Sequence, residues 1–112
     1  MALKTSREEL RDAAGEVDFR GEQFGTNVSF IWVEARPGEG PRLHRHAYDE
    51  VFVILEGNAR FRVGDQTIEV TSGDVLVGPA NVPHAFKNIG PGVLRQIDIH
   101  VSDHILTEWL EE

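Results

Sequence analysis

The chain has 112 residues, no cysteine and a formal net charge of −8 at pH 7. This length gives room for one domain with one core over residues 1–112, and without cysteine neither disulfides nor thiolate metal sites can form. The acidic charge argues against nucleic acid and anionic membranes as partners, because both bind basic surfaces. The first residues lack the apolar run of a leader and no run is long enough to span a bilayer, so we expect a cytoplasmic protein.

Near the N-terminus the sequence predicts a short helix over Arg7–Ala14. Ser6 and Glu9 match a capping box, and Gly15 is suited to end the helix. From residue 27 onwards the pattern changes to strands. The run Val28–Ala35 is rich in β-branched and aromatic residues, which favours an extended strand.

The middle of the chain predicts three further strands. Val51–Leu55 is apolar at every position, so we expect a strand that is covered on both faces. Ala59–Val63 and Gln66–Val70 alternate between apolar and polar residues, and Gly64-Asp65 between them fits a two-residue type II′ hairpin turn. This alternation predicts that Phe61, Val63, Ile68 and Val70 face inward, and that Arg60, Arg62 and Glu69 face outward.

Strands are also predicted over Val75–Val77 and Val93–Val101, whereas the tail after Ser102 has apolar residues at helical spacing. Those residues are Ile105, Leu106, Trp109 and Leu110. Many short strands separated by turn signals indicate a sandwich or a barrel. We predict an all-β, double-stranded β-helix of the jelly-roll type with short N- and C-terminal helical segments, because closure removes exposed strand edges.

Four residues have the types and spacing of a metal site. His44 and His46 lie two apart, so in a strand their side chains point the same way. Glu50 follows with the same parity, and His84 lies on a later segment. Three imidazoles and a carboxylate suit one divalent ion of Fe, Mn, Ni, Co or Zn, with two octahedral positions left open. The alternative is that these histidines are ordinary core or surface residues, but this explains less well why four candidate ligands occur in two spaced segments. Asp49, next to Glu50, is interpreted as a solvated carboxylate.

The two segments resemble the two motifs of the cupin superfamily, in particular its small single-domain members. Residues 38–57 hold the first motif with Gly38, His44, His46, Glu50 and Gly57. Residues 73–88 hold the second motif with Gly73, Pro79, Asn81, His84 and Asn88. The departure is Asn81, where the family usually has glycine; asparagine also tolerates the left-handed backbone, so the turn should persist. The resemblance implies the β-helix barrel, the four metal ligands and several usable metals.

Six residues are candidates for the wall of a substrate pocket. Arg42 could hold a carboxylate or phosphate near the barrel mouth, although an arginine in such a loop is often a plain surface residue. His100 shares parity with Gln96 on the last strand and could border the pocket, but the sequence favours a packing role for it; His104 is interpreted as exposed. The complete set of pocket candidates is Arg42, Tyr48, Phe52, Phe86, Gln96 and His100. Phe52 fits the core better than Phe86 does.

Two functions fit these patterns. The first is a metal-dependent, dioxygenase-like or isomerase-like enzyme acting on a small organic substrate, anionic ones included, with Glu50 as the catalytic residue that takes a proton. The second is a non-catalytic module that binds or senses a metal or a small ligand, and we rank it below the enzyme. Because Val51–Leu55 needs cover outside the barrel, we also expect a homodimer that buries the N-terminal region, one sheet face and Trp109.

Overall fold

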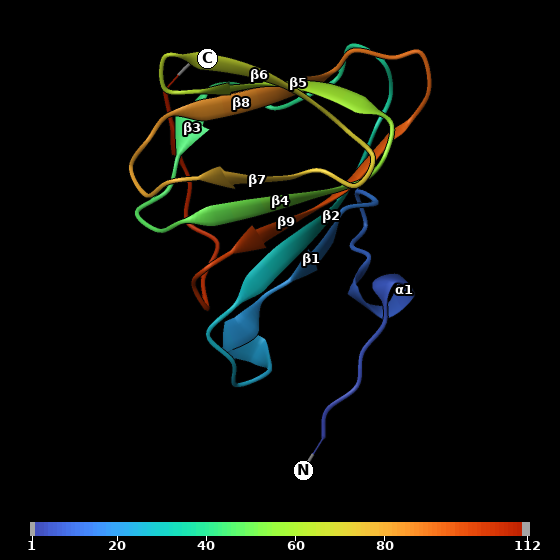
Figure 1. The fold of residues 1–112 in the computed structure, drawn as a ribbon. Coiled ribbons are helices and arrows are strands. Elements are labelled where there is room, and N and C mark those ends of the chain that lie inside the picture. Colours follow the sequence, from blue (N-terminus) through green and yellow to red (C-terminus); the bar gives the residue numbers. More distant parts are fainter. Residues whose placement is uncertain (1, 111–112) are drawn as a thin grey trace.

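The computed structural model describes residues 2–110 as two facing antiparallel β-sheets with little helix (Figure 1). The first sheet contains, in spatial order, β1 (Val17–Phe19), β2 (Ser29–Ala35), β9 (Leu94–His100), β4 (Glu50–Glu56) and β7 (Val75–Gly78). The second contains β10 (Glu108–Trp109), β3 (His44–Arg45), β8 (His84–Asn88), β5 (Asn58–Val63) and β6 (Gln66–Thr71). This architecture confirms the predicted all-β jelly-roll barrel. A short helix α1 (Arg7–Leu10) and a 3-10 turn η1 (Gly21–Gln23) accompany the sheets.

The space between the sheets is apolar at one end and polar at the other. On β4 the inward positions are, in order, Glu50, Phe52 and Ile54, each at most 2% exposed. Phe52 packs edge-on against Phe61 of the opposite sheet, with ring centroids 4.8 Å apart, and Phe61 stacks on Phe86. The apolar end therefore holds the barrel together, while the polar end is free to carry chemistry.

Two tight turns fold as the sequence predicts. The β5–β6 hairpin pairs Val63 with Gln66 around Gly64, whose φ of 58° matches the first central position of a type II′ turn. Asn81 has a φ of 65°, the left-handed conformation that asparagine tolerates better than other non-glycine residues. Asparagine at the usual glycine position therefore leaves the second motif's turn intact.

The helical prediction for the C-terminal tail is wrong. The described part of the tail, up to Leu110, contains no helix: it begins with bends at residues 101–104, and Glu108 and Trp109 form β10 against β3. Leu110 N–H donates to the carbonyl of Leu43 at 3.0 Å. A short isolated helix is marginally stable, whereas β3 offers unpaired backbone groups along its edge, so strand pairing prevails. Residues 111 and 112 lie outside the described part.

The N-terminal helix is shorter than the predicted span Arg7–Ala14, because α1 ends at Leu10. Ser6 caps it as expected, accepting a hydrogen bond from Glu9 N–H at 3.2 Å. Arg11 is already extended and forms a bridge with Val17 of β1. Among the described residues, no helix has the length and apolar character needed to cross a membrane.

Candidate metal centre

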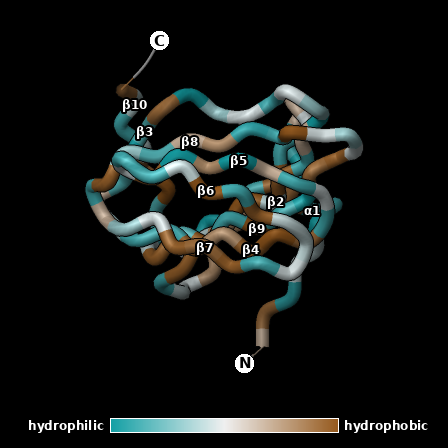
Figure 2. Tube along the Cα trace, turned by 45° about the horizontal axis from the view of Figure 1, so that its top comes forward, coloured by the Kyte–Doolittle hydropathy of each residue, from teal (hydrophilic) through white to brown (hydrophobic). Residues whose placement is uncertain are grey.

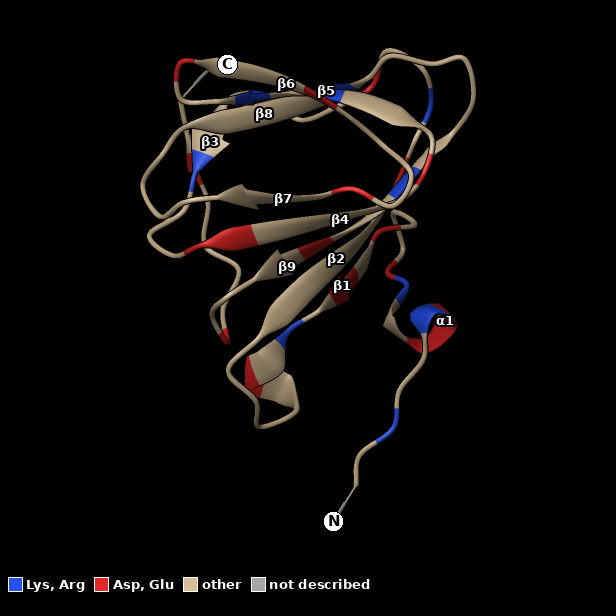
Figure 3. Cartoon of the chain, in the orientation of Figure 1, with Lys and Arg blue, Asp and Glu red and all other residues tan. Residues whose placement is uncertain are grey.

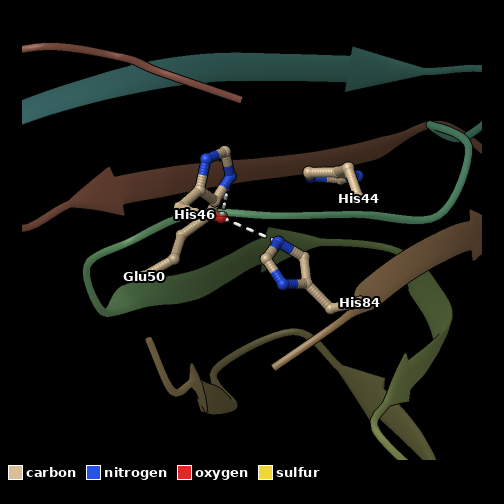
Figure 4. Close-up of side chains that lie close together, drawn as sticks. All are labelled: His44, His46, Glu50 and His84. Atoms are coloured by element: carbon tan, nitrogen blue, oxygen red, sulfur yellow. Dashed lines mark hydrogen bonds and ion pairs between the residues drawn. The ribbon is translucent and has the colours of Figure 1, made fainter. Parts of the chain in front are cut away.

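Three strands bring the four predicted ligands together at the polar end of the barrel (Figure 4). His44 lies on β3 directly opposite His84 on β8, His46 follows β3, and Glu50 begins β4. All four are buried, with between 1% and 7% of each residue exposed. One ligand atom from each residue lies within 4.8 Å of the others, so the group could hold a metal ion.

The Nδ1 atom of each of the three histidines is engaged by a backbone carbonyl. The Nδ1 of His44 lies 2.7 Å from the carbonyl oxygen of Arg42, and that of His46 lies 2.8 Å from the carbonyl of Leu106. His84 makes the same contact with the carbonyl of Val82 at 3.2 Å. A carbonyl oxygen only accepts, so each Nδ1 carries the proton and each neutral ring keeps a lone pair on Nε2. This is how proteins orient histidines that bind metals.

Electron-rich atoms therefore face one another at the centre of the site. The Nε2 atoms of His46 and His84 lie 3.1 Å and 3.0 Å from the same oxygen, Oε1 of Glu50. The Nε2 of His46 is buried and has no hydrogen-bond partner with acceptable geometry. Lone pairs so close to a carboxylate need a positive charge between them, either a proton or a metal ion. The donor set thus fits a divalent transition metal, which prefers imidazole nitrogen and carboxylate oxygen.

The protonation of the site follows from burial and these contacts. Burial alone would raise the pKa of Glu50, but in the metal-free protein a proton shared with the neighbouring imidazoles of His100, His46 and His84 outweighs burial and holds the pKa far below its usual value. Burial lowers the pKa of His44 to about 4, so this ring is neutral and available near pH 7. Burial acts in the same direction on His46, but contacts with Glu50 and the Leu106 carbonyl override it and raise its pKa.

His100 belongs to the site, although the sequence favoured a packing role for it. It is 2% exposed, and its Nε2 lies 3.3 Å from the second carboxylate oxygen of Glu50. Its Nδ1 lies 2.8 Å from the hydroxyl of Tyr48, which also accepts a hydrogen bond from Leu106 N–H. The only sequence signal for this role was that positions 96 and 100 point to the same side of one strand. It could not show the pairing of β9 with β4, which places His100 directly opposite Glu50.

A second carboxyl group, Asp98, lies next to this cluster on β9. It is 5% exposed, and its Oδ1 accepts a hydrogen bond from the Gln96 amide at 2.7 Å. Burial, and then the nearby charge of Glu50, raise the pKa of Asp98 well above its usual value. Asp98 therefore keeps its proton to a higher pH than an exposed carboxyl group does, and in the protonated form it can donate a hydrogen bond.

The cluster opens into a cavity of about 490 Å³ that also continues to the outer side of β2. Near the site its lining includes Asp98, Phe86, His100, Thr107 and Trp109. The predicted pocket residue Phe86 is thus part of the wall, whereas Phe52 belongs to the core and Gln96 is fully buried behind Asp98.

Arg42 lies at the rim rather than in the cavity wall. It is exposed, and its guanidinium carbon lies 4.9 Å from the centre of the Trp109 ring. Asp49 is exposed as expected, although its carboxylate accepts a hydrogen bond from Ala80 N–H at 2.8 Å. His104 is exposed and forms ion pairs with Glu22 and Asp103 instead of reaching the site.

Comparison with known proteins decides the family. The profile of the cupin domain matches residues 31–100, which is more than half of the chain and includes all four candidate ligands. The chain belongs to the cupin family. Cupins include many enzymes, so the family is compatible with catalysis without specifying a reaction.

Individual relatives are distant or uncharacterised. An uncharacterised protein of Streptomyces coelicolor is 43% identical over 44 residues, which cover 39% of this cupin and 42% of that relative. The fold matches Bacillus subtilis oxalate decarboxylase, an enzyme with Mn(II) centres, with a TM-score of 0.79 at 24% identity over 85% of this chain and 27% of that one. A cupin superfamily protein of Desulfitobacterium hafniense gives a TM-score of 0.63 at 26% identity over 68% of each chain.

Proposed function

We propose that this cupin is a metal-dependent enzyme that acts on a small organic substrate, with one divalent transition metal held by His44, His46, Glu50 and His84. One observation carries the proposal: backbone carbonyls fix the Nδ1 protons of all three histidines, so three Nε2 lone pairs and one carboxylate oxygen converge. In an ordinary core histidine both ring nitrogens find separate hydrogen-bond partners. Here the Nε2 atoms instead point toward one another and toward one carboxylate.

When bound, such a metal would supply Lewis-acid or redox chemistry next to the cavity. An open coordination position is typical of catalytic sites, and four protein ligands leave two positions free on an octahedral ion. The family relationship and the donor set support several metals equally. We therefore name Fe, Mn, Ni, Co and Zn as candidates and assign none of them.

The chain's own side chains give the cavity a defined polarity. Burial raises the pKa of Asp98, and in its protonated form this side chain can donate a hydrogen bond to a substrate oxygen. Glu50 is the group that would take a substrate proton at its carboxylate, and this role requires that metal binding or substrate binding relieve the contacts that lower its pKa. Phe86 and Trp109 shield the same cavity from water.

The charges around the cavity favour a substrate with a neutral oxygen-bearing group in the interior over one with an anionic group there. Within the described cavity wall the acidic residues near the site are Glu50 and Asp98, and Arg42 lies outside at the rim over Trp109. A carboxylate or phosphate on the substrate would therefore lie at the mouth, while a hydroxyl or carbonyl group would reach the interior.

Metal content of untagged protein, purified without chelators and measured by elemental mass spectrometry, tests the proposal. We expect close to one equivalent per chain, lost in the variant His84→Ala. The variant His104→Ala is the matched control, because His104 is exposed and ion-paired away from the site. Equal metal content in wild type and His84→Ala would contradict the proposal.

The same protein loaded with Mn(II) separates an enzyme from a non-catalytic binding module. A site with an open coordination position exchanges water and accelerates the proton relaxation of the solvent. A closed site leaves solvent relaxation near that of the metal-free protein, and this result would favour the sensing or binding function.

A further inference from the structure

Strand β9 points polar side chains into the barrel and isoleucines out of it. Gln96, Asp98 and His100 face inward and are at most 5% exposed, and Figure 2 shows hydrophilic and hydrophobic residues alternating along β9. A buried polar group is unfavourable unless it finds a hydrogen-bond partner. The Gln96 amide donates to Asp98, so these two satisfy part of each other's need. The partners of His100 lie elsewhere, and they define its role.

The two ring nitrogens of His100 face different partners. Strand β9 lies beside β4, and His100 is directly opposite Glu50, the acidic residue with which β4 begins (Figure 3). The Nε2 of His100 lies 3.3 Å from Oε2 of Glu50, and its Nδ1 lies 2.8 Å from the Tyr48 hydroxyl. The other oxygen of Glu50, Oε1, is the one that the Nε2 atoms of His46 and His84 approach. The two carboxylate oxygens therefore have separate neighbours.

The proton of the Tyr48 hydroxyl is directed at His100. The hydroxyl oxygen accepts a hydrogen bond from Leu106 N–H at 3.2 Å. Its own proton has three acceptors to choose from: Nδ1 of His100 at 2.8 Å, Nδ1 of His46 at 3.3 Å and the Leu106 carbonyl at 3.4 Å. The Nδ1 of His46 carries a proton for the Leu106 carbonyl at 2.8 Å, so it has no lone pair to offer. The shortest contact, with His100, is therefore the hydrogen bond.

A neutral imidazole that accepts at Nδ1 carries its proton on Nε2. This is the opposite of the tautomer in the three histidine ligands, whose Nδ1 protons are held by backbone carbonyls. We propose that His100 is a positioning residue and not a ligand: its Nε2–H donates to Oε2 of Glu50 and restricts Glu50 to metal binding through Oε1. This inference rests on the proposed metal-dependent function.

The surroundings of His100 support this role. It lies outside the group of four residues whose ligand atoms are all within 4.8 Å of one another. Its Nε2 is buried and has no other hydrogen-bond partner among the described residues, so Oε2 of Glu50 is the acceptor within reach. Packing fixes the rings that carry the chain of hydrogen bonds. The Tyr48 ring stacks on His46 at 5.0 Å between centroids, and His100 packs edge-on against the same ring at 4.7 Å.

The hydrogen bond to Oε2 affects how many coordination positions stay open. A carboxylate binds a metal ion through one oxygen or through both, and a second bound oxygen would occupy a further position. With Oε2 of Glu50 held by His100, the four ligands use four positions and leave two for a substrate on an octahedral ion. Carboxylates that bind metals are commonly oriented by such hydrogen bonds. Tyr48 and His100 thus keep the site open without touching the substrate.

Nitrogen NMR of the ¹⁵N-labelled full chain loaded with Zn(II) reads the tautomers directly, because protonated, unprotonated and metal-bound ring nitrogens have distinct chemical shifts. We expect the ring proton on Nδ1 in His44, His46 and His84 and on Nε2 in His100. A proton on Nδ1 of His100, or zinc bound to its Nε2, would overturn the inference while leaving the metal function intact. Failure of the protein to take up zinc or any other candidate metal would overturn the proposed function, and the inference with it.

Two substitutions of His100 test the effect on the metal. Gln offers an N–H donor near the position of Nε2, whereas Leu offers none. In calorimetric titration with Zn(II), His100→Leu should bind 10- to 100-fold more weakly than wild type, and His100→Gln should recover at least about tenfold of this loss. Equal affinities of the two variants would overturn the inference. His104→Leu is the matched control and should bind as wild type does, because His104 is exposed and ion-paired away from the site.

Solvent proton relaxation of the Mn(II)-loaded variants tests the open position. Without the donor, Glu50 is free to bind through both oxygens and to take a position that water would otherwise occupy. We expect slower solvent relaxation with His100→Leu than with His100→Gln. Equal relaxation would show that His100 does not restrict Glu50 to one oxygen. If the leucine variant does not fold, the NMR measurement on wild type still decides the tautomer and the role of His100.

Discussion

Replacing Glu50 by glutamine separates a metal site from a structural ion-pair cluster, because the two interpretations predict opposite effects on the metal-free protein. The amide has the shape of the carboxylate but no charge, and its NH₂ group can donate to lone pairs. The Nε2 atoms of His46 and His84, 3.1 Å and 3.0 Å from Oε1 of Glu50, are such acceptors when the rings are neutral. At pH 8 we therefore expect metal-free Glu50→Gln to unfold at the same temperature as metal-free wild type, or higher.

The loaded protein should respond in the other direction. At a metal concentration of about 1,000 times the wild-type Kd, binding stabilises the fold by about 4.1 kcal/mol. Loss of a supporting residue outside the coordination sphere already weakens binding 10- to 100-fold, so loss of a charged ligand should weaken it at least ~100-fold. The stabilisation then falls to about 1.4 kcal/mol. A loss of ~2.7 kcal/mol corresponds to a decrease in Tm of roughly 11 °C for a chain of this size.

Thermal unfolding followed by circular dichroism, with and without added metal at pH 8, measures both quantities. Removing one partner of a purely structural buried ion pair costs about 3–5 kcal/mol without any metal. A decrease of that size in metal-free Glu50→Gln, together with an unchanged metal-induced shift, would refute the metal interpretation. The control variant Glu69→Gln, an exposed acid paired with Arg60, should change stability by less than ~1 kcal/mol in both states.

Three further predictions follow from the site. His46→Ala should lose both the metal and its thermal stabilisation, whereas Arg42→Ala should keep both; equal metal content in the two variants would contradict the ligand assignment. Tyr48→Phe removes the hydroxyl 2.8 Å from the Nδ1 of His100 and should weaken metal binding about 10-fold in isothermal titration calorimetry, since it frees a group that contacts Glu50. Because the pKa of His46 is raised and that of His44 lies near 4, metal binding should displace a proton from His46 and none from His44. The apparent association constant should then rise about tenfold per pH unit up to the pKa of His46 and level off above it, and a constant affinity over this range would contradict the assignment.

The sequence predicted that the side chains of His44, His46, Glu50 and His84 converge, because most of this signal is local. His44 lies on β3, His46 directly follows this strand, and Glu50 begins β4, so three of the four ligands depend on a stretch of seven residues. The fourth, His84, needed the second motif, and the register confirms it directly opposite His44. Spacing within a strand translates into geometry with few alternatives.

What the sequence could not show depends on contacts between distant segments. The tail has helical periodicity, yet its backbone pairs with β3, and the carbonyl of Leu106 fixes the proton on Nδ1 of His46. Backbone carbonyls have no side-chain signature, so a residue's type does not reveal this role. His100 was undervalued for the same reason, since its partner Glu50 is fifty residues away along the chain and adjacent only through the β4–β9 register.

The strand β4 explains why one short segment could be so apolar and still carry the site. Its inward side chains change from Glu50, at the metal group, to Phe52 and Ile54 in the core. Its outward side chains, Val51 and Val53, lie on the outer face of the first sheet. Because successive residues of a strand point to opposite faces, the two sets are independent of each other. An unbroken apolar run in an antiparallel sheet therefore places apolar side chains on both of its faces, one set in the core and the other on the outer face.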